Sequence, residues 1–134
     1  MSTALTPAKF IEKSERALQP AKLLAGAGEI EGACNRAYYA MYDAAHAALS
    51  ALKKADYKVT KTHSGLIAAF GLHIVSSGKI SRELGRSLNE VEQLRLLADY
   101  TGEDVTANQA LDAVSKAERF VAAVRAMLSS DGAI

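Results

Sequence analysis

Ionisable side chains recur at helical spacing in the most patterned part of the chain, residues 35–49. Arg36, Tyr39, Asp43, His46 and Ser50 step by three, four, three and four residues, so a helix would place them on one face. That face would offer a guanidinium for anions, and a carboxylate and an imidazole for proton transfer. An ordinary solvated helix face has the same pattern, so this polar row does not establish a site by itself.

The same helix would also carry a buried stripe. Small and apolar residues recur at steps of three and four, namely Ala33, Ala37, Met41, Ala44, Ala48 and Leu52. The pattern predicts that this helix, from about residue 29 to residue 53, is the one around which the others pack.

The composition predicts an all-α fold. The 134 residues, 49% hydrophobic and 23% charged, have the size and balance of one globular domain spanning residues 1–134. Aromatic residues make up only 6%, and Ala and Leu are abundant, which favours helices over strands.

Capping residues divide the chain into five expected helical segments with short joints. The expected caps are Thr6, Thr60 or Thr62, Ser81 and Thr106, and the second segment follows the Gly26 and Gly28 break. The third segment is expected to run through Ile74 to residues 76–78. Because short joints make neighbouring helices antiparallel, we predict an up-and-down four-helix bundle with an additional fifth helix.

The third segment contains a stripe of small residues, Ser64, Ala68, Gly71 and Val75. A glycine inside a helix costs about 1 kcal/mol relative to Ala. The stripe predicts that a neighbouring helix approaches closely here, which would offset that cost.

The sequence gives no sign of export or membrane insertion. Cys34 is the only cysteine, so it cannot form an internal disulfide, and we expect it to be a small packing residue. The first ten residues do not have the pattern of a secretory signal, and no run approaches about 18 apolar residues. We expect a cytoplasmic protein that does not associate with membranes.

Charge is distributed unevenly along the chain. Residues 53–86 contain seven basic and two acidic residues, whereas residues 87–134 contain four basic and eight acidic residues. The basic middle could attract phosphate, or it could be matched by the acidic last third of the same chain or of a second subunit.

Three ordered blocks within about residues 31–100 resemble the HEPN domain family. The blocks are NRAYYAMYDAAHAAL, KTHSGLIAAFG and RELGRSLNEVEQLRLLADY. The similarity is to the small stand-alone branch, the HepT-like and UPF0332-like proteins. It implies a helical bundle that pairs as a homodimer and acts as a toxin-type, metal-independent endoribonuclease. It also implies a nucleotidyltransferase antitoxin as partner, and neither a metal nor another cofactor.

The motif of the active family members is incomplete here. Those members carry an Arg followed four to six residues later by a His, and two such motifs meet across the dimer cleft. The matching arginine is Arg95, but Asp99 stands where the His is expected, and Tyr100 follows. Metal-free RNA cleavage needs a base, an acid and a cation for the phosphorane. Histidine, with an unperturbed pKa of about 6.5, suits proton transfer better than aspartate at about 3.9.

Other residues could complete or replace this motif. Arg95 could hold a phosphate with its planar fork, or it could simply pair with Asp99 one turn later. His63 and His46 are candidates for the missing imidazole, and a structural, hydrogen-bonded histidine is the alternative for each. Lys61 lies in the same block as His63 and is a candidate RNA contact.

Two hypotheses of different classes follow. In the first, a dimer groove binds RNA or a nucleotide and cuts RNA, with His63 as base, Arg95 on the phosphate and Asp99 orienting it or acting as a weak base. The groove would be lined by Arg36, Asp43, Arg95, Asp99 and Tyr100, with Tyr100 donating a hydrogen bond. In the second, the same residues form a dimer network in a non-catalytic homodimeric interaction or nucleotide-binding module that partners a nucleotidyltransferase.

Overall fold

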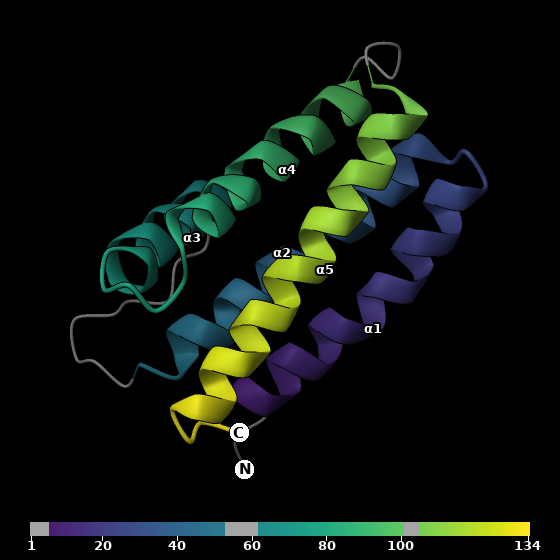
Figure 1. Cartoon of the computed structure of the whole chain (residues 1–134). Helices are drawn as coiled ribbons and strands as arrows, with labels where there is room; N and C mark the ends of the chain where they lie inside the picture. The colour runs from purple at the N-terminus through teal and green to yellow at the C-terminus, as the bar shows by residue number, and fades with distance from the viewer. Residues whose placement is uncertain (1–5, 53–61, 101–104) are drawn as a thin grey trace.

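The computed structural model describes residues 6–52, 62–100 and 105–134, and every regular element in these ranges is helical (Figure 1). The elements are α1 (Pro7–Gly26), α2 (Ile30–Ser50), α3 (His63–Phe70), the π-helical turn η1 (Gly71–Val75), α4 (Arg82–Tyr100) and α5 (Ala107–Ser130). The predicted all-α class is therefore confirmed.

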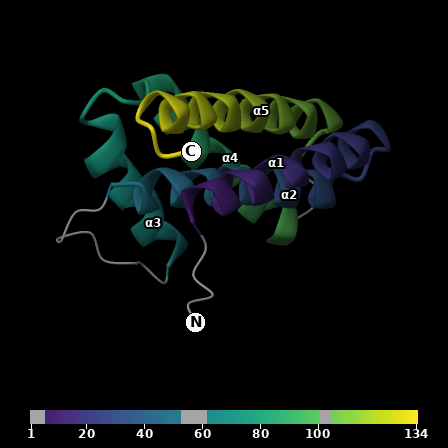
Figure 2. The same cartoon turned by 90° about the horizontal axis from the view of Figure 1, so that it is seen from below.

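Four long helices form the bundle, and a short one is added to it. Along the chain α1, α2, α4 and α5 run alternately in opposite directions, which confirms the up-and-down prediction (Figure 1). The additional element is α3 with η1, which lies beside the end of α2 and the start of α4 (Figures 1 and 2).

The core is organised around α2, as its apolar stripe predicts. Every other α-helix contacts α2, and its stripe from Ala33 to Ala48 is buried. Small side chains on α2 let its neighbours approach closely, so that the backbone itself is within reach. Ser14 of α1 reaches the α2 backbone in this way, since its buried hydroxyl donates a 2.7 Å hydrogen bond to the Ala40 carbonyl. Cys34 is buried in this core, as expected of a packing residue.

Side-chain caps begin four of the helices near the expected positions. Hydroxyl oxygens accept hydrogen bonds from backbone N–H groups three residues ahead at Thr6, Thr62, Ser81 and Thr106. These bonds satisfy N–H groups that the helix itself leaves unpaired. The cap at Thr62 fixes His63 as the first residue of α3.

The sequence predicts one continuous helix for the third segment, but the structure divides this segment into two parts. It changes at Gly71 into η1, where the Ser76 N–H donates to the Gly71 carbonyl five residues back, at 3.0 Å. At Gly71 the predicted close approach is wrong, because a Cβ built there would meet nothing within 4 Å. A neighbouring helix does approach the predicted stripe closely at Val75, where a Cβ on Gly85 of α4 would lie 2.8 Å from Val75 Cγ2.

Candidate functional site

Arg95 lies at the centre of a cluster of polar and aromatic side chains between α2, α3 and α4. Its guanidinium is 3.4 Å from Asp99 Oδ2 and 3.7 Å from Glu92 Oε2, one helical turn to either side. We define the Arg95 cluster by its members, which are Asn35, Tyr38, Tyr39, His63, Glu92, Arg95 and Asp99. The expected pairing of Arg95 with Asp99 is thus present, and Glu92 is a second carboxylate on the same arginine.

His63 joins this cluster through two contacts of one ring nitrogen. Its Nδ1 is hydrogen-bonded to the Tyr38 hydroxyl at 2.8 Å and lies 3.9 Å from Glu92 Oε2. The direction of the Tyr38 proton depends on the tautomer of the imidazole. Because Nδ1 is occupied and the side chain is 34% exposed, Nε2 is the nitrogen left for an incoming group. The ring is therefore oriented by the protein rather than merely placed at the surface.

Aromatic rings enclose the guanidinium from the α2 side. Arg95 Cζ lies 4.7 Å from the centroid of the Tyr38 ring and 5.8 Å from that of Tyr39, which is within the range of cation–π attraction. Burial, together with the nearby Glu92 carboxylate, raises the pKa of the Tyr38 hydroxyl far above its usual value. Tyr38 is therefore a neutral hydrogen-bonding group at any physiological pH.

Two buried polar atoms in the Arg95 cluster have no hydrogen-bond partner among the residues that the structure describes. They are Arg95 Nε and Glu92 Oε2. The Arg95 and Glu92 side chains are only 13% and 12% exposed, so bulk water does not satisfy these atoms freely. A buried donor or acceptor left unpaired costs about 1–3 kcal/mol. Glu92 is still close to Arg95, His63 and the Tyr38 hydroxyl, so Arg95 Nε is the clearer case of an unused donor in the cluster.

Asp99 connects the cluster to α2. Its Oδ1 accepts a 3.2 Å hydrogen bond from Asn35 Nδ2, while Oδ2 faces Arg95. The cluster therefore holds two carboxylates against one guanidinium and one titratable imidazole. An added anion would have to compete with Asp99 for Arg95, which limits phosphate binding in the arrangement observed.

The polar row of α2 does not converge on the Arg95 cluster. Tyr39 lies beside Arg95, but Asp43 faces α1, where its Oδ1 is 4.0 Å from Lys13 Nζ. Burial raises the pKa of the Asp43 carboxyl, and Lys13 opposes that shift. His46 stacks on Phe10 of α1 at a centroid distance of 5.1 Å. Asp43 and His46 thus take part in the contact between α1 and α2.

The remaining predicted site residues lie outside the cluster or outside the described ranges. Arg36 and Tyr100 are both exposed, and neither makes a hydrogen bond or ion pair with any described residue. Lys61 lies outside the described residues, as do Lys53, Lys54 and Lys58 of the basic segment. Of the seven predicted site residues, the structure brings Arg95, Asp99 and His63 together.

Sequence reasoning missed three members of the cluster. Glu92 precedes Arg95 by three residues, so helical spacing could have identified it as a partner. Tyr38 is fully buried like a core aromatic, but its hydroxyl also positions His63. Asn35 and Asp99 are 64 residues apart in sequence, and no local pattern links them.

Among the residues that the structure describes, no group of three or more His, Cys, Asp and Glu side chains is arranged to hold a metal ion. None of the helices described combines the length and the apolar character needed to cross a membrane.

The Tyr38–His63 hydrogen bond gives a direct prediction. Tyr38→Phe removes the hydroxyl that holds Nδ1, so His63 should lose its fixed tautomer and the unfolding free energy should fall by about 1 kcal/mol. Tyr42→Phe is the matched control, because the Tyr42 ring also lies near the His63 ring, at a centroid distance of 4.7 Å compared with 5.4 Å for Tyr38, but makes no hydrogen bond to it in the structure. Nitrogen NMR of the imidazole reports the change. An unaltered His63 spectrum in Tyr38→Phe would refute the assigned contact.

Comparison with known proteins supports the resemblance seen in the sequence. A model of the HEPN domain matches residues 8–127. A UPF0332 protein of Gloeobacter violaceus is 38% identical over 93 residues, covering 69% of this chain and 71% of the relative. A protein of Methanocaldococcus jannaschii with the name "Putative toxin MJ0605" is 35% identical over 119 residues, 89% of this chain and 86% of the relative. A UPF0332 protein of Thermotoga maritima is 34% identical over 118 residues, 87% of this chain and 86% of the relative. The family model covers nearly the whole chain, and three relatives are at least 34% identical to it. The protein therefore belongs to the HEPN domain family.

Proposed function

We propose that this HEPN protein is a toxin-type endoribonuclease that cuts RNA without a metal ion at the Arg95 cluster. The name of the Methanocaldococcus jannaschii relative supports the toxin part of the proposal. The observation that carries the catalytic part is the orientation of His63, whose Nδ1 is held by buried Tyr38 and whose ring is partly exposed.

The chemistry divides among the cluster residues as follows. His63 Nε2 takes the proton from a ribose 2′-hydroxyl, since an imidazole held at its other nitrogen is well placed as a general base. The 2′-oxygen then bonds to the adjacent phosphorus, the bond from phosphorus to the 5′-oxygen breaks, and the leaving 5′-oxygen takes its proton from water. Arg95 stabilises the negative charge that develops on the phosphate, because its planar fork matches two phosphate oxygens. Asp99 holds Arg95 in the free protein and must give up part of that contact when the phosphate arrives.

We further propose that the active form is a homodimer joined near the Arg95 cluster. Large apolar side chains are exposed at this end of α4 and on the neighbouring α2, namely Tyr39, Leu97 and Tyr100. Leu97 and Tyr100 are three residues apart and so lie on the same side of the helix. Of these residues Tyr39 lies beside Arg95, so a second copy that covers Tyr39 would exclude water from this side of the cluster.

A second function is favoured by a different observation. Arg95 is already engaged by two carboxylates, and its side chain is only 13% exposed. That arrangement suits a structural network in a non-catalytic interaction module. In either case we propose a nucleotidyltransferase as the antitoxin partner, a proposal that rests on the family membership and on the toxin name of one relative.

The two functions are separated by RNA cleavage in the presence of a chelator. We expect the purified chain to degrade single-stranded RNA in excess EDTA. His63→Ala should slow cleavage by at least about 100-fold, because it removes the general base. Arg95→Lys should also be strongly impaired, because a lysine keeps the charge but loses the fork.

His73→Ala is the matched control, because it removes a histidine of η1 rather than of the Arg95 cluster. It should cleave like the unsubstituted protein, and circular dichroism should show that all variants are folded. Intact RNA after incubation with the unsubstituted protein would refute the endoribonuclease and favour the interaction module.

The homodimer is tested by sedimentation equilibrium at micromolar concentration. Leu97→Arg should shift the protein from dimer to monomer, because it places a charge in the proposed contact. Leu111→Arg on α5 is the matched control, since the exposed fractions of Leu97 and Leu111 are 45% and 48%. The proposal fails if the unsubstituted protein is a monomer, or if both variants behave alike.

A further inference from the structure

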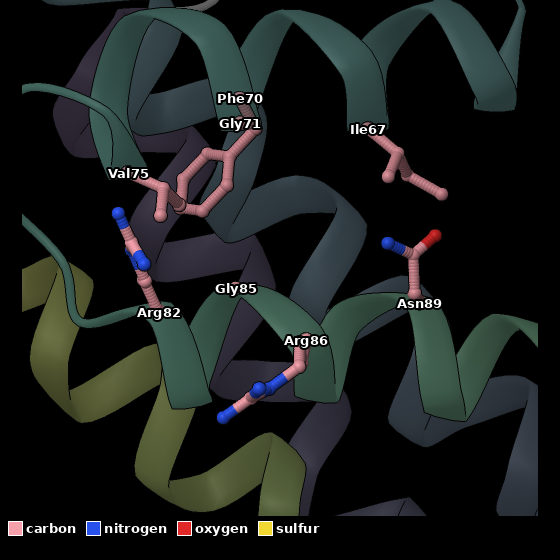
Figure 3. A pocket seen from close by; sticks show the side chains of 8 residues that line it. All are labelled: Ile67, Phe70, Gly71, Val75, Arg82, Gly85, Arg86 and Asn89. Carbon is pink, nitrogen blue, oxygen red and sulfur yellow. The ribbon is translucent and has the colours of Figure 1, made fainter.

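A pocket separate from the Arg95 cluster lies between α3 with η1 and the first half of α4 (Figure 3). Its volume is about 260 Å³. Its lining surface is mainly apolar, although the side chains that form it include three polar ones, and they are Ile67, Phe70, Val75, Arg82, Arg86 and Asn89. We call it the Gly71 pocket, because Gly71 lines it and has no side chain to fill the open space in front of it.

The structure explains why this space is open. The π-helical turn starts at Gly71 and moves the wall of the pocket away from the regular path of α3. Across the pocket, Gly85 lets α4 contact Val75 without a side chain of its own in between. Figure 3 shows Arg82 and Asn89 extending toward the opposite helix at the two ends of the pocket, with Gly85 between them.

The pocket is positively charged. Neither Arg82 nor Arg86 forms an ion pair with any of the described residues. The acidic residues of this part of α4, Glu83 and Glu90, instead line a small hollow together with Lys116 and Arg119 of α5. The two sides of α4 therefore differ in charge, and its arginines are available to an anion in the Gly71 pocket.

The Gly71 pocket continues the Arg95 cluster along both of its walls. On α3, Ile67 follows His63 by four residues, and on α4, Asn89 precedes Glu92 by three residues. These separations are one helical turn, about 5 Å. A flexible polymer that reaches the cluster can therefore place its next unit in the pocket.

We propose that the Gly71 pocket binds one base of a single-stranded RNA whose adjacent phosphate lies at the Arg95 cluster. The half-buried apolar residues Ile67 and Val75 contact the base, and Arg82 and Arg86 bind the flanking phosphate. Asn89 has both a donor and an acceptor, so its amide hydrogen-bonds to the edge of the base and selects among bases. The pocket is smaller than most sites for whole ligands, which are roughly 300–1,000 Å³, so it admits one base and no duplex.

This inference rests on the proposed action on RNA, and the experiment separates the two. Gly71→Leu fills the pocket, and Gly26→Leu is the matched control because neither glycine has a positive φ or an atom within 4 Å of its added Cβ. Binding of a tetranucleotide and of a nucleoside monophosphate is measured by NMR titration of the full chain. We expect Gly71→Leu to weaken tetranucleotide binding roughly tenfold, the size of one lost base contact, and Gly26→Leu to have no effect.

Asn89→Ala supplies a readout that a folding defect would not mimic. In cleavage of a random-sequence RNA pool by this variant, the preference for the base at one position beside the cut should disappear. Cleavage with unaltered preference in both Asn89→Ala and Gly71→Leu would overturn the inference and leave the endoribonuclease standing. Equal affinity for monophosphate and tetranucleotide would also overturn it, since the pocket would then serve a free nucleotide. Tetranucleotide binding that depends on Gly71 in a protein that does not cut RNA would support the pocket and refute the proposed catalysis.

Discussion

One carboxylate, that of Glu92, connects the arginine and the histidine on which the candidate site depends. Its Oε2 is 3.7 Å from the Arg95 guanidinium and 3.9 Å from His63 Nδ1, and its side chain is only 12% exposed. A charge held that far from water is tolerated only when opposite charges and hydrogen bonds surround it. Glu92 therefore fixes Arg95 of α4 and His63 of α3 relative to each other.

The helix at the centre of the bundle makes this arrangement possible. Buried alanines along one side of α2 let its neighbours pack closely, while Asn35, Tyr38 and Tyr39 on another side project into the Arg95 cluster. The short helix α3 adds His63 at its first position, where the Thr62 cap determines the start of the helix. The site thus combines two long helices of the bundle, α2 and α4, with the beginning of a short peripheral one.

The fold was largely predictable from the sequence because its determinants are local. The apolar stripe of α2, the caps at Thr6, Ser81 and Thr106, and the short joints are visible in the sequence as spacing and residue type. The π-helical turn was not predictable, because a glycine in a helical pattern looks the same whether a neighbour packs on it or a pocket opens beside it. Gly71 and Gly85 differ only in what lies across from them.

The candidate site was predictable only in part. Arg95, Asp99 and His63 could be named in advance, because they fall in blocks that resemble a family or follow helical spacing. The grouping of Asn35 with Asp99 and of Tyr38 with His63 depends on contacts between different helices, and the sequence does not contain them as a pattern. Asp43 was predicted to line the site because of its helical spacing, but it faces α1 instead. Spacing along one helix does not show which neighbouring helix a side chain meets.

The most direct test of this account is a double-mutant cycle of Glu92→Gln and Arg95→Met, measured by chemical denaturation. Breaking a buried pair from one side leaves the other charge uncompensated, so each single variant should lose about 2–4 kcal/mol of unfolding free energy. The double variant should lose less than the sum of the two by at least about 1 kcal/mol. Losses that add to within about 0.5 kcal/mol would show that the two residues act independently, and would contradict the central role assigned to Glu92.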